Sequence, residues 1–220
     1  LYLTQRGIEC PLPVLRRDGT LLSTIADRPA AIVTFLKGSG LKSPRSSHCA
    51  EAGAGLAKLH LAGHDFPLSR QNNLGHAYWQ SFYSPNAARA NEVMPSLATE
   101  IEHELERIAK HWPSDLPSGI IHADLFPDNP FFLDDKLSGI IDFYFACTDF
   151  YAYDLAICLN AWCFEADMTF NLTKARAMIN SYHKVRPLSE NELEHLPLLC
   201  AGASMRFLLT RLHDWLNRAD

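Results

Sequence analysis

The sequence lacks a paired cysteine motif. None of its six cysteines forms a C-x-x-C pair, and no secretory signal peptide is visible. Disulfides persist in oxidising compartments, so the thiols are expected to be reduced and the protein cytoplasmic. The cysteines are Cys10, Cys49, Cys147, Cys158, Cys163 and Cys200.

A basic surplus is missing as well. Lys and Arg number 20 against 25 Asp and Glu, which gives a formal net charge of −5. Proteins that bind phosphate backbones usually carry a basic face. Nucleic acid is therefore not an expected partner, and the net charge indicates little else, since it bears on solubility and steering rather than on fold.

No long apolar run is free of charge. The most apolar window, residues 143–164, contains Asp149 and Asp154. Charged side chains inside a bilayer are costly, so this window is predicted to form core rather than a membrane span.

The first part of the chain has the character of a β-rich lobe. Its 220 residues suffice for two lobes with a real core. Residues 1–6 are typical of a helix end capped by Gly7, and Asp18-Gly19 predicts a hairpin turn. The apolar run 30–36 is followed by a flexible joint of glycine and serine. We therefore predict that residues 1–37 are the remainder of an N-terminal lobe with the hinge, and that residues 38–220 form a C-terminal catalytic lobe.

The remainder alternates between helical patterns and a short β segment. Ser46 and Ser47 are the expected caps of the first helix, and residues 63–88 have no period, which predicts an irregular insertion. Apolar spacing predicts helices over residues 46–61, 97–112, 171–183 and 201–216, a strand over 119–121, and a hairpin of 131–133 with 137–141. The predicted fold class is α+β.

Residues 122–129 match H-x-D-x-x-x-x-N, the catalytic-loop pattern of kinases, and Ile141-Asp142-Phe143 supplies the D-F of D-F-G. The strand before the loop and the hairpin between the motifs make a chance match improbable. Phosphoryl transfer requires an acceptor hydroxyl aimed at the γ-phosphate and cations that spread the developing charge. The spacing places Asp124 to accept the hydroxyl proton. Asn129 and Asp142 supply the oxygen ligands that Mg²⁺ prefers.

The motifs together resemble bacterial homoserine kinases of the aminoglycoside-phosphotransferase type. The resemblance rests on I-H-A-D-L-F-P-D-N, on L-S-G-I-I-D-F-Y-F-A-C-T-D, on Y-D-L-A-I-C-L-N-A-W-C-F and on the R-F-L-L-T-R-L segment that starts at Arg206. It runs over nearly the whole chain. It implies a protein-kinase-like fold of two lobes, with a partial β-rich N-lobe and a mostly helical C-lobe that carries the catalytic hairpin. It also implies transfer of the ATP γ-phosphate to L-homoserine for threonine biosynthesis.

The resemblance also implies roles for individual residues. Asp124 would be the catalytic base, His122 would brace the loop, and Asp154 would hold the loop from below. Asn129 and Asp142 would bind Mg²⁺. The adenine of ATP would meet the backbone of the hinge, which consists of Thr34, Phe35 and Leu36 within the run 32–36.

The chain departs from that family pattern in two places. Homologues have a phosphate-covering loop and an ATP-pairing lysine before the hinge, whereas no lysine precedes Lys37 here. If the front of the lobe were truly absent, a non-catalytic pseudokinase binding module would be the alternative. In addition, Pro130 follows Asn129 and removes a backbone N–H at a strand start.

The sequence leaves several chemical classes of acceptor open. From Tyr144 to the end there are 9 Asp and Glu against 7 Lys and Arg, which favours a small zwitterion over a polycationic aminoglycoside. Arg206 and Arg211 are candidates for its carboxylate, with a salt bridge to Asp214 or another surface acid as the alternative. Tyr144 and the aromatic residues after it could instead surround a choline-type cation.

Two further groups of residues are weaker candidates for a functional role. His60 and His64 have the spacing of helical metal ligands but no glutamate between them, so metal binding is not favoured. Trp79, Trp162 and Trp215 are predicted to pack in the core, with a substrate pocket as the alternative for Trp79.

Overall fold

The computed structural model describes residues 1–218. Helices dominate the chain after residue 45, and the strands form three separate two-stranded sheets. The strands are β1 (Ser23–Ile25), β2 (Arg28–Ala30), β3 (Ser118–Ile121), β4 (Pro130–Leu133), β5 (Lys136–Ile140) and β6 (Cys147–Phe150). The α-helices are α1 (Ser46–Ala62), α2 (His76–Tyr83), α3 (Ala90–Val93), α4 (Leu97–His111), α5 (Tyr151–Trp162), α6 (Leu172–Val185) and α7 (Glu190–Leu216), with short 3-10 turns η1 (Thr4–Arg6), η2 (Ser84–Arg89) and η3 (Phe143–Phe145).

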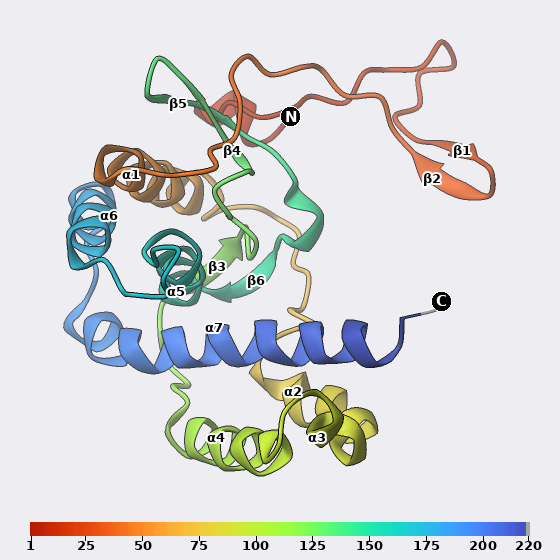
Figure 1. Ribbon diagram of the computed structural model, residues 1–220. Coiled ribbons are helices and arrows are strands. Elements are labelled where there is room, and N and C mark those ends of the chain that lie inside the picture. Colours follow the sequence, from red (N-terminus) through yellow and green to blue (C-terminus); the bar gives the residue numbers. More distant parts are fainter. Residues whose placement is uncertain (219–220) are drawn as a thin grey trace.

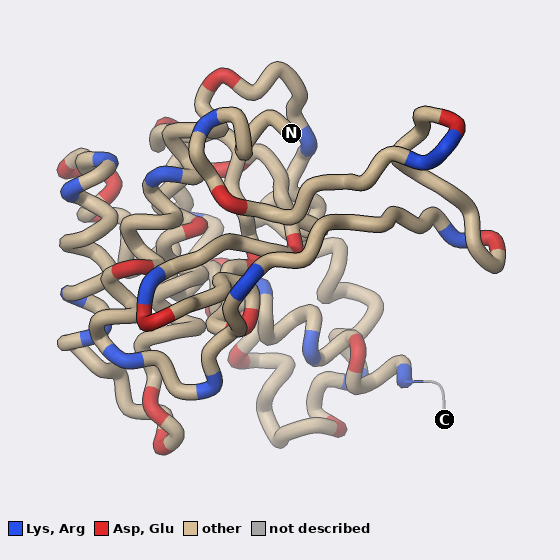
Figure 2. The backbone as a smooth tube through the Cα atoms, turned by 90° about the horizontal axis from the view of Figure 1, so that it is seen from above, with Lys and Arg blue, Asp and Glu red and all other residues tan. Residues whose placement is uncertain are grey.

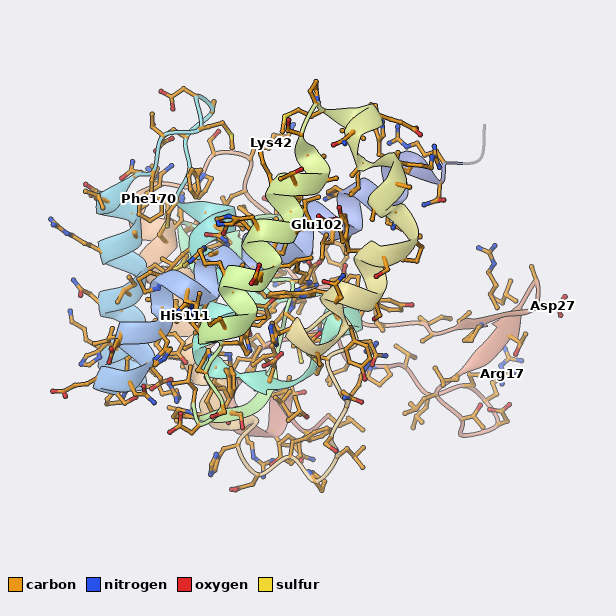
Figure 3. The ribbon with its side chains drawn as sticks, turned by 90° about the horizontal axis from the view of Figure 1, so that it is seen from below. Arg17, Asp27, Lys42, Glu102, His111 and Phe170 are labelled. Atoms are coloured by element: carbon orange, nitrogen blue, oxygen red, sulfur yellow. The ribbon has the colours of Figure 1, made fainter. Side chains whose placement is uncertain are left out.

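The first 40 residues contain a projecting β-ribbon, which we call the arm (residues 12–36). Figure 1 shows it extending away from the helices, and Arg17 and Asp27 mark its tip in Figure 3. Gly7 caps η1 with a φ of 79°, as predicted. A turn does form at Asp18-Gly19, but the paired strands β1 and β2 meet around Ala26-Asp27. The predicted hairpin was therefore placed several residues too early.

The helical part is built around α5. Nearly every residue of this helix is buried, which explains why residues 143–164 form the most apolar window. A helix that is apolar on all sides must be covered on all sides, and α1, α6, α7 and β3 contact it. The prediction of core for this window is confirmed. No helix within residues 1–218 is long and apolar enough to span a membrane.

The long helix α7 runs across the molecule beneath α5, with α2, α3 and α4 on its other side (Figure 1). The view from below in Figure 3 shows α4, labelled at Glu102 and His111, in front of α7. The predicted apolar stripe of α4 is buried, and helix formation stops before Pro113. Figure 2 shows positions of Lys and Arg interspersed with positions of Asp and Glu along the backbone.

Three helix predictions were wrong in detail. Residues 63–88 are not irregular throughout, because α2 and the start of η2 lie within them. Helix α7 begins at Glu190 rather than 201, with Ser189 as a capping-box residue and Pro197 inside the helix. The N-cap of α1 is Arg45, whose backbone N–H donates to His48 Nδ1 at 3.1 Å, so Ser46 and Ser47 lie inside the helix. Trp215 was also predicted to pack, but 64% of it is exposed.

Gly53 and Gly55 lie inside α1, where glycine lowers helix stability relative to alanine, and the structure shows what faces each of them. A Cβ on Gly53 would lie less than 3.0 Å from the carbonyl oxygen of Met178 on α6. Glycine at this position therefore allows α1 and α6 to pack backbone against backbone. At Gly55 the obstacle is a methyl group at the end of the Leu137 side chain, which can move.

These contacts predict different effects for two matched substitutions. Gly55→Ala is expected to be nearly neutral, because a gain in helix propensity of about 1 kcal/mol offsets a small shift of Leu137. Gly53→Ala gains the same propensity but forces two backbones apart, so the free energy of unfolding should fall by about 2 kcal/mol. Denaturant unfolding of both variants measures the difference. Equal stability of the two would contradict the close approach of α1 and α6.

Candidate active site

The loop between β3 and β4, residues 122–129, carries the side chains predicted to handle the phosphoryl group. Ala123 adopts a left-handed backbone with a φ of 64°, so the chain turns sharply just before Asp124. The Phe126 N–H donates to the Asp124 carbonyl at 2.8 Å. Asn129 donates to the same carbonyl through Nδ2 at 2.6 Å. Because its amide nitrogen is used inside the loop, Asn129 keeps Oδ1 as an acceptor for a cation.

His122 is fully buried and connects the loop to the hairpin. Its Nε2 lies 2.9 Å from the Ile141 carbonyl oxygen, and the Asp124 backbone N–H donates to its Nδ1 at 3.3 Å. A carbonyl only accepts and a backbone N–H only donates, so these contacts select the tautomer with the proton on Nε2. His122 thereby joins the residue preceding Asp142 to the residue predicted as the base.

Asp154 on α5 lies under the loop and is fully buried. The backbone N–H of His122 donates to its Oδ2 at 2.7 Å, and that of Ala123 donates to its Oδ1 at 2.8 Å. His60 Nε2 lies 3.0 Å from Oδ2, and His60 Nδ1 lies 2.7 Å from the Tyr182 hydroxyl. Burial alone would raise the pKa of Asp154, but its hydrogen bonds, led by that from His60, hold the pKa below its usual value. Asp154 is therefore a charged anchor for the backbone of the loop.

Asp142 follows directly after the hairpin of β4 and β5. That hairpin pairs Pro130 with Ile140, and the Ile141 N–H donates to the Asn129 carbonyl at 3.0 Å. Asn129 and Asp142 are thus held on neighbouring chain segments, with the Asp142 side chain exposed and its φ at 62°. A free amide oxygen and an exposed carboxylate fit Mg²⁺, which usually keeps waters and substrate phosphates among its ligands. Within residues 1–218, no cluster of three or more His, Cys, Asp or Glu is placed to hold a metal.

A cavity of about 350 Å³ lies beside Asp124, between the catalytic loop and α7. Arg206 lines it and is only 3% exposed. Its Nη1 donates to the Ala123 carbonyl at 2.5 Å, while its buried Nε has no partner within residues 1–218. Arg211 lines the same cavity. Burial raises the pKa of Asp124, and the positive charge of Arg206 opposes that rise.

Other predicted residues do not line this cavity. Tyr144 is 74% exposed and packs edge-on against Phe145, outside the lining of the cavity. The hinge residues 34–36 end the arm, where the Thr34 N–H donates to the Leu12 carbonyl at 2.8 Å. Phe35 is 89% exposed. Trp79 is buried, and its Nε1 donates to the Leu74 carbonyl at 2.8 Å, so packing is its main role.

Two residues that belong to the candidate site were not identified from the sequence. His60 was considered only as a metal ligand with His64, whereas it is buried against Asp154 and His64 is largely exposed. Asp214, considered only as a partner of the two arginines, lines the cavity with Arg211 instead. No ion pair joins these two side chains within residues 1–218. The helical spacing of Arg206, Arg211 and Asp214 was the available signal.

Comparison with known proteins places these features in context. The family described as "Phosphotransferase enzyme family" matches residues 1–188. A homoserine kinase of Rhodospirillum rubrum is 60% identical over 216 residues, which cover 98% of this chain and 67% of that protein. A homoserine kinase of Xanthobacter autotrophicus is 58% identical, with the same coverage of 98% and 67%.

Among solved structures, an amicoumacin kinase in complex with AMP-PNP and Ca²⁺ superposes with a TM-score of 0.74. It is 17% identical, and the match covers 100% of this chain and 70% of that one. Similarity at this identity concerns the fold alone. It confirms the predicted α+β fold of the protein-kinase-like type, with a mostly helical C-terminal part that carries the catalytic hairpin.

Proposed function

Because this chain belongs to the phosphotransferase enzyme family, we propose that it transfers the γ-phosphoryl group of ATP to the hydroxyl of L-homoserine, yielding O-phosphohomoserine for threonine biosynthesis. Homoserine is proposed as the acceptor because the chain is 60% and 58% identical to two homoserine kinases over 98% of its length. The loop geometry supports the reaction class independently, since Asp124, Asn129 and Asp142 occur in the arrangement that phosphoryl transfer requires.

At the γ-phosphorus, the reaction makes one bond and breaks one. The homoserine hydroxyl oxygen attacks the γ-phosphorus, the bond to the oxygen bridging the β- and γ-phosphates breaks, and ADP leaves. Asp124 is the residue placed to accept the hydroxyl proton. It lines the cavity, is half-buried, and takes part in loop packing through its backbone rather than its carboxylate. Within residues 1–218 the carboxylate forms no hydrogen bond, so it can accept the proton of the acceptor hydroxyl.

Asn129 Oδ1 and the Asp142 carboxylate are the proposed Mg²⁺ ligands. The cation, when bound with ATP, would neutralise charge on the phosphates. The protein's own contribution is to fix the two ligands, through the Asn129 bond to the Asp124 carbonyl and the Ile141 bond to the Asn129 carbonyl. His122 and Asp154 act through the loop backbone, so we propose them as positioning residues.

The nucleotide side of the site extends toward the arm. We propose that the backbone of residues 34–36 meets adenine and that the lobe boundary lies between residues 37 and 38. A sharp bend supports the boundary, because Gly38 has a φ of 107° and Ser138 Oγ donates to the Lys37 carbonyl at 2.7 Å. A cytoplasmic location, where ATP is available, is consistent with this proposal.

An acceptor panel in a coupled ADP assay tests the function. The full-length protein should release ADP with L-homoserine at a kcat/KM at least 10-fold above that with choline, ethanolamine or kanamycin, since a site that pairs both ends of its substrate rejects analogues that lack one. Phosphorus NMR of the product should show a phosphomonoester. Preference for choline or kanamycin would identify a related small-molecule kinase instead. No ADP release with any acceptor would favour a binding module without activity.

A further inference from the structure

The cavity beside Asp124 is lined on its α7 side by side chains of both charges. Its remaining wall is apolar and comes from Leu74, Phe82, Phe145 and Phe207. Besides Asp124 itself, Asp214 is the only carboxylate that lines this cavity in the described part of the chain, and the cations are Arg206 and Arg211. Such a cavity matches a small molecule with one positive group, one negative group and a short apolar stem.

The helix orders these groups along one line. Arg206, Thr210 and Asp214 are spaced by four residues and so lie on one face of α7. With a rise of 1.5 Å per residue, Asp214 lies about 12 Å along the axis from Arg206. Helical side chains lean toward the N-terminus, so the Asp214 carboxylate reaches back toward Thr210. Arg206, which is bound to the Ala123 carbonyl, marks the reacting end, and Asp214 marks the far end.

Arg211 and Asp214 are not engaged with one another. They are spaced by three residues, an arrangement that often pairs opposite charges on a helix, yet neither side chain forms an ion pair or hydrogen bond within residues 1–218. Both side chains are exposed to solvent and both line the cavity. Two unpaired opposite charges that line one cavity can each take one charged group of a zwitterion.

We propose that Asp214 binds the α-ammonium group of the acceptor and that Arg211 binds its carboxylate. This assignment rests on the proposed function, and it makes Asp214 the residue that distinguishes an amino acid from a hydroxy acid. The hydroxyl, on the two-carbon side chain, then extends along the apolar wall toward Asp124. The opposite charges of the pair fix which end of the acceptor is bound and which end reacts.

Two analogues separate the contributions. Relative to L-homoserine, 4-hydroxybutanoate lacks the ammonium group, and 3-amino-1-propanol lacks the carboxylate. In the full-length protein, Asp214→Asn should lower kcat/KM roughly 10- to 100-fold for homoserine and for 3-amino-1-propanol, as expected for loss of a charged hydrogen bond. The value for 4-hydroxybutanoate should stay unchanged. Arg211→Gln should show the reverse pattern and spare only 3-amino-1-propanol.

The controls keep the outcomes distinct. Asp65→Asn removes an exposed carboxylate outside this cavity and should change none of the three values. Asp214→Glu should recover part of the homoserine preference. If Asp214→Asn lowered all three values equally, or changed none, the ammonium assignment would be wrong. If the wild-type protein did not phosphorylate homoserine while it phosphorylated another acceptor, the proposed function itself would fail.

Discussion

Replacing Asp124 with asparagine should lower kcat for homoserine phosphorylation by about 1,000-fold, within the range ascribed to general-base catalysis. Asparagine has nearly the same shape, and the Asp124 carbonyl, which holds Asn129 and Phe126, stays in place. The loop should therefore keep its conformation while losing the proton acceptor. Single-turnover kinetics at saturating ATP and homoserine in the full-length protein measure this loss apart from product release.

Asp128→Asn is the matched control for this experiment. Asp128 lies in the same loop and carries the same charge, but its side chain is exposed and does not line the cavity. We expect its kcat to stay within about 3-fold of the wild type, because an exposed charge near the site is screened by solvent and salt. A loss at Asp124 of less than 10-fold, or an equal loss at Asp128, would refute the assignment of the base.

The parts of the site that could be predicted from the sequence depend on short chain segments. The strand before the loop, the catalytic loop and the hairpin before Asp142 form one continuous stretch. Their geometry follows from turn chemistry and from strand pairing at short range. Pro130 was expected to remove a backbone N–H at the strand start, and it pairs with Ile140 as the first residue of β4. The missing N–H of Pro130 is tolerated here because its partner in the strand pair, Ile140, donates its own backbone N–H to the Glu9 carbonyl at 2.9 Å.

The parts that could not be predicted depend on contacts between distant segments. His60 on α1 meets Asp154 on α5, and neither local sequence indicates the other. Asp214 gains its place in the cavity only because α7 crosses under the loop, a placement set by packing around α5. The extent of α7 was also underestimated, because Pro197 lies inside the predicted gap between helices. Proline usually ends a helix, and only the tertiary structure shows that this helix continues.

At Asp154, one contact was predicted from the sequence and another appears only in the structure. The resemblance predicted that it would hold the catalytic loop, and the structure adds the buried His60 and Tyr182 on its other side. The loop that carries Asp124, the proposed base, is thus fixed by a carboxylate that belongs to the core of the molecule. Substitution of Asp154 should therefore lower both kcat and stability, whereas substitution of Asp124 should lower kcat alone.

Asp154→Ala is expected to lower the free energy of unfolding by about 4 kcal/mol, because breaking a buried charged network leaves its donors unsatisfied. The donors concerned are the backbone N–H groups of His122 and Ala123 and the Nε2 group of His60. Denaturant unfolding measures the loss of stability. Hydrogen exchange measures the local effect, and the amides of His122 and Ala123 should lose protection even under strongly native conditions. The kcat should fall by about 100-fold, since the base is no longer held in place.

Asp149→Ala provides the matched control from the same segment. Asp149 is half-buried, and it accepts from Asn72 Nδ2 at 2.6 Å and from the Phe150 N–H at 2.7 Å, but it makes no bond to the loop. Its loss should cost about 1–2 kcal/mol of stability and leave exchange at residues 122 and 123 unchanged. If Asp154→Ala does not fold, Asp154→Asn retains one acceptor oxygen and should show a smaller effect at the same two amides. Unchanged protection of these amides in both Asp154 variants would show that the loop is held by His122 and Arg206 rather than by Asp154.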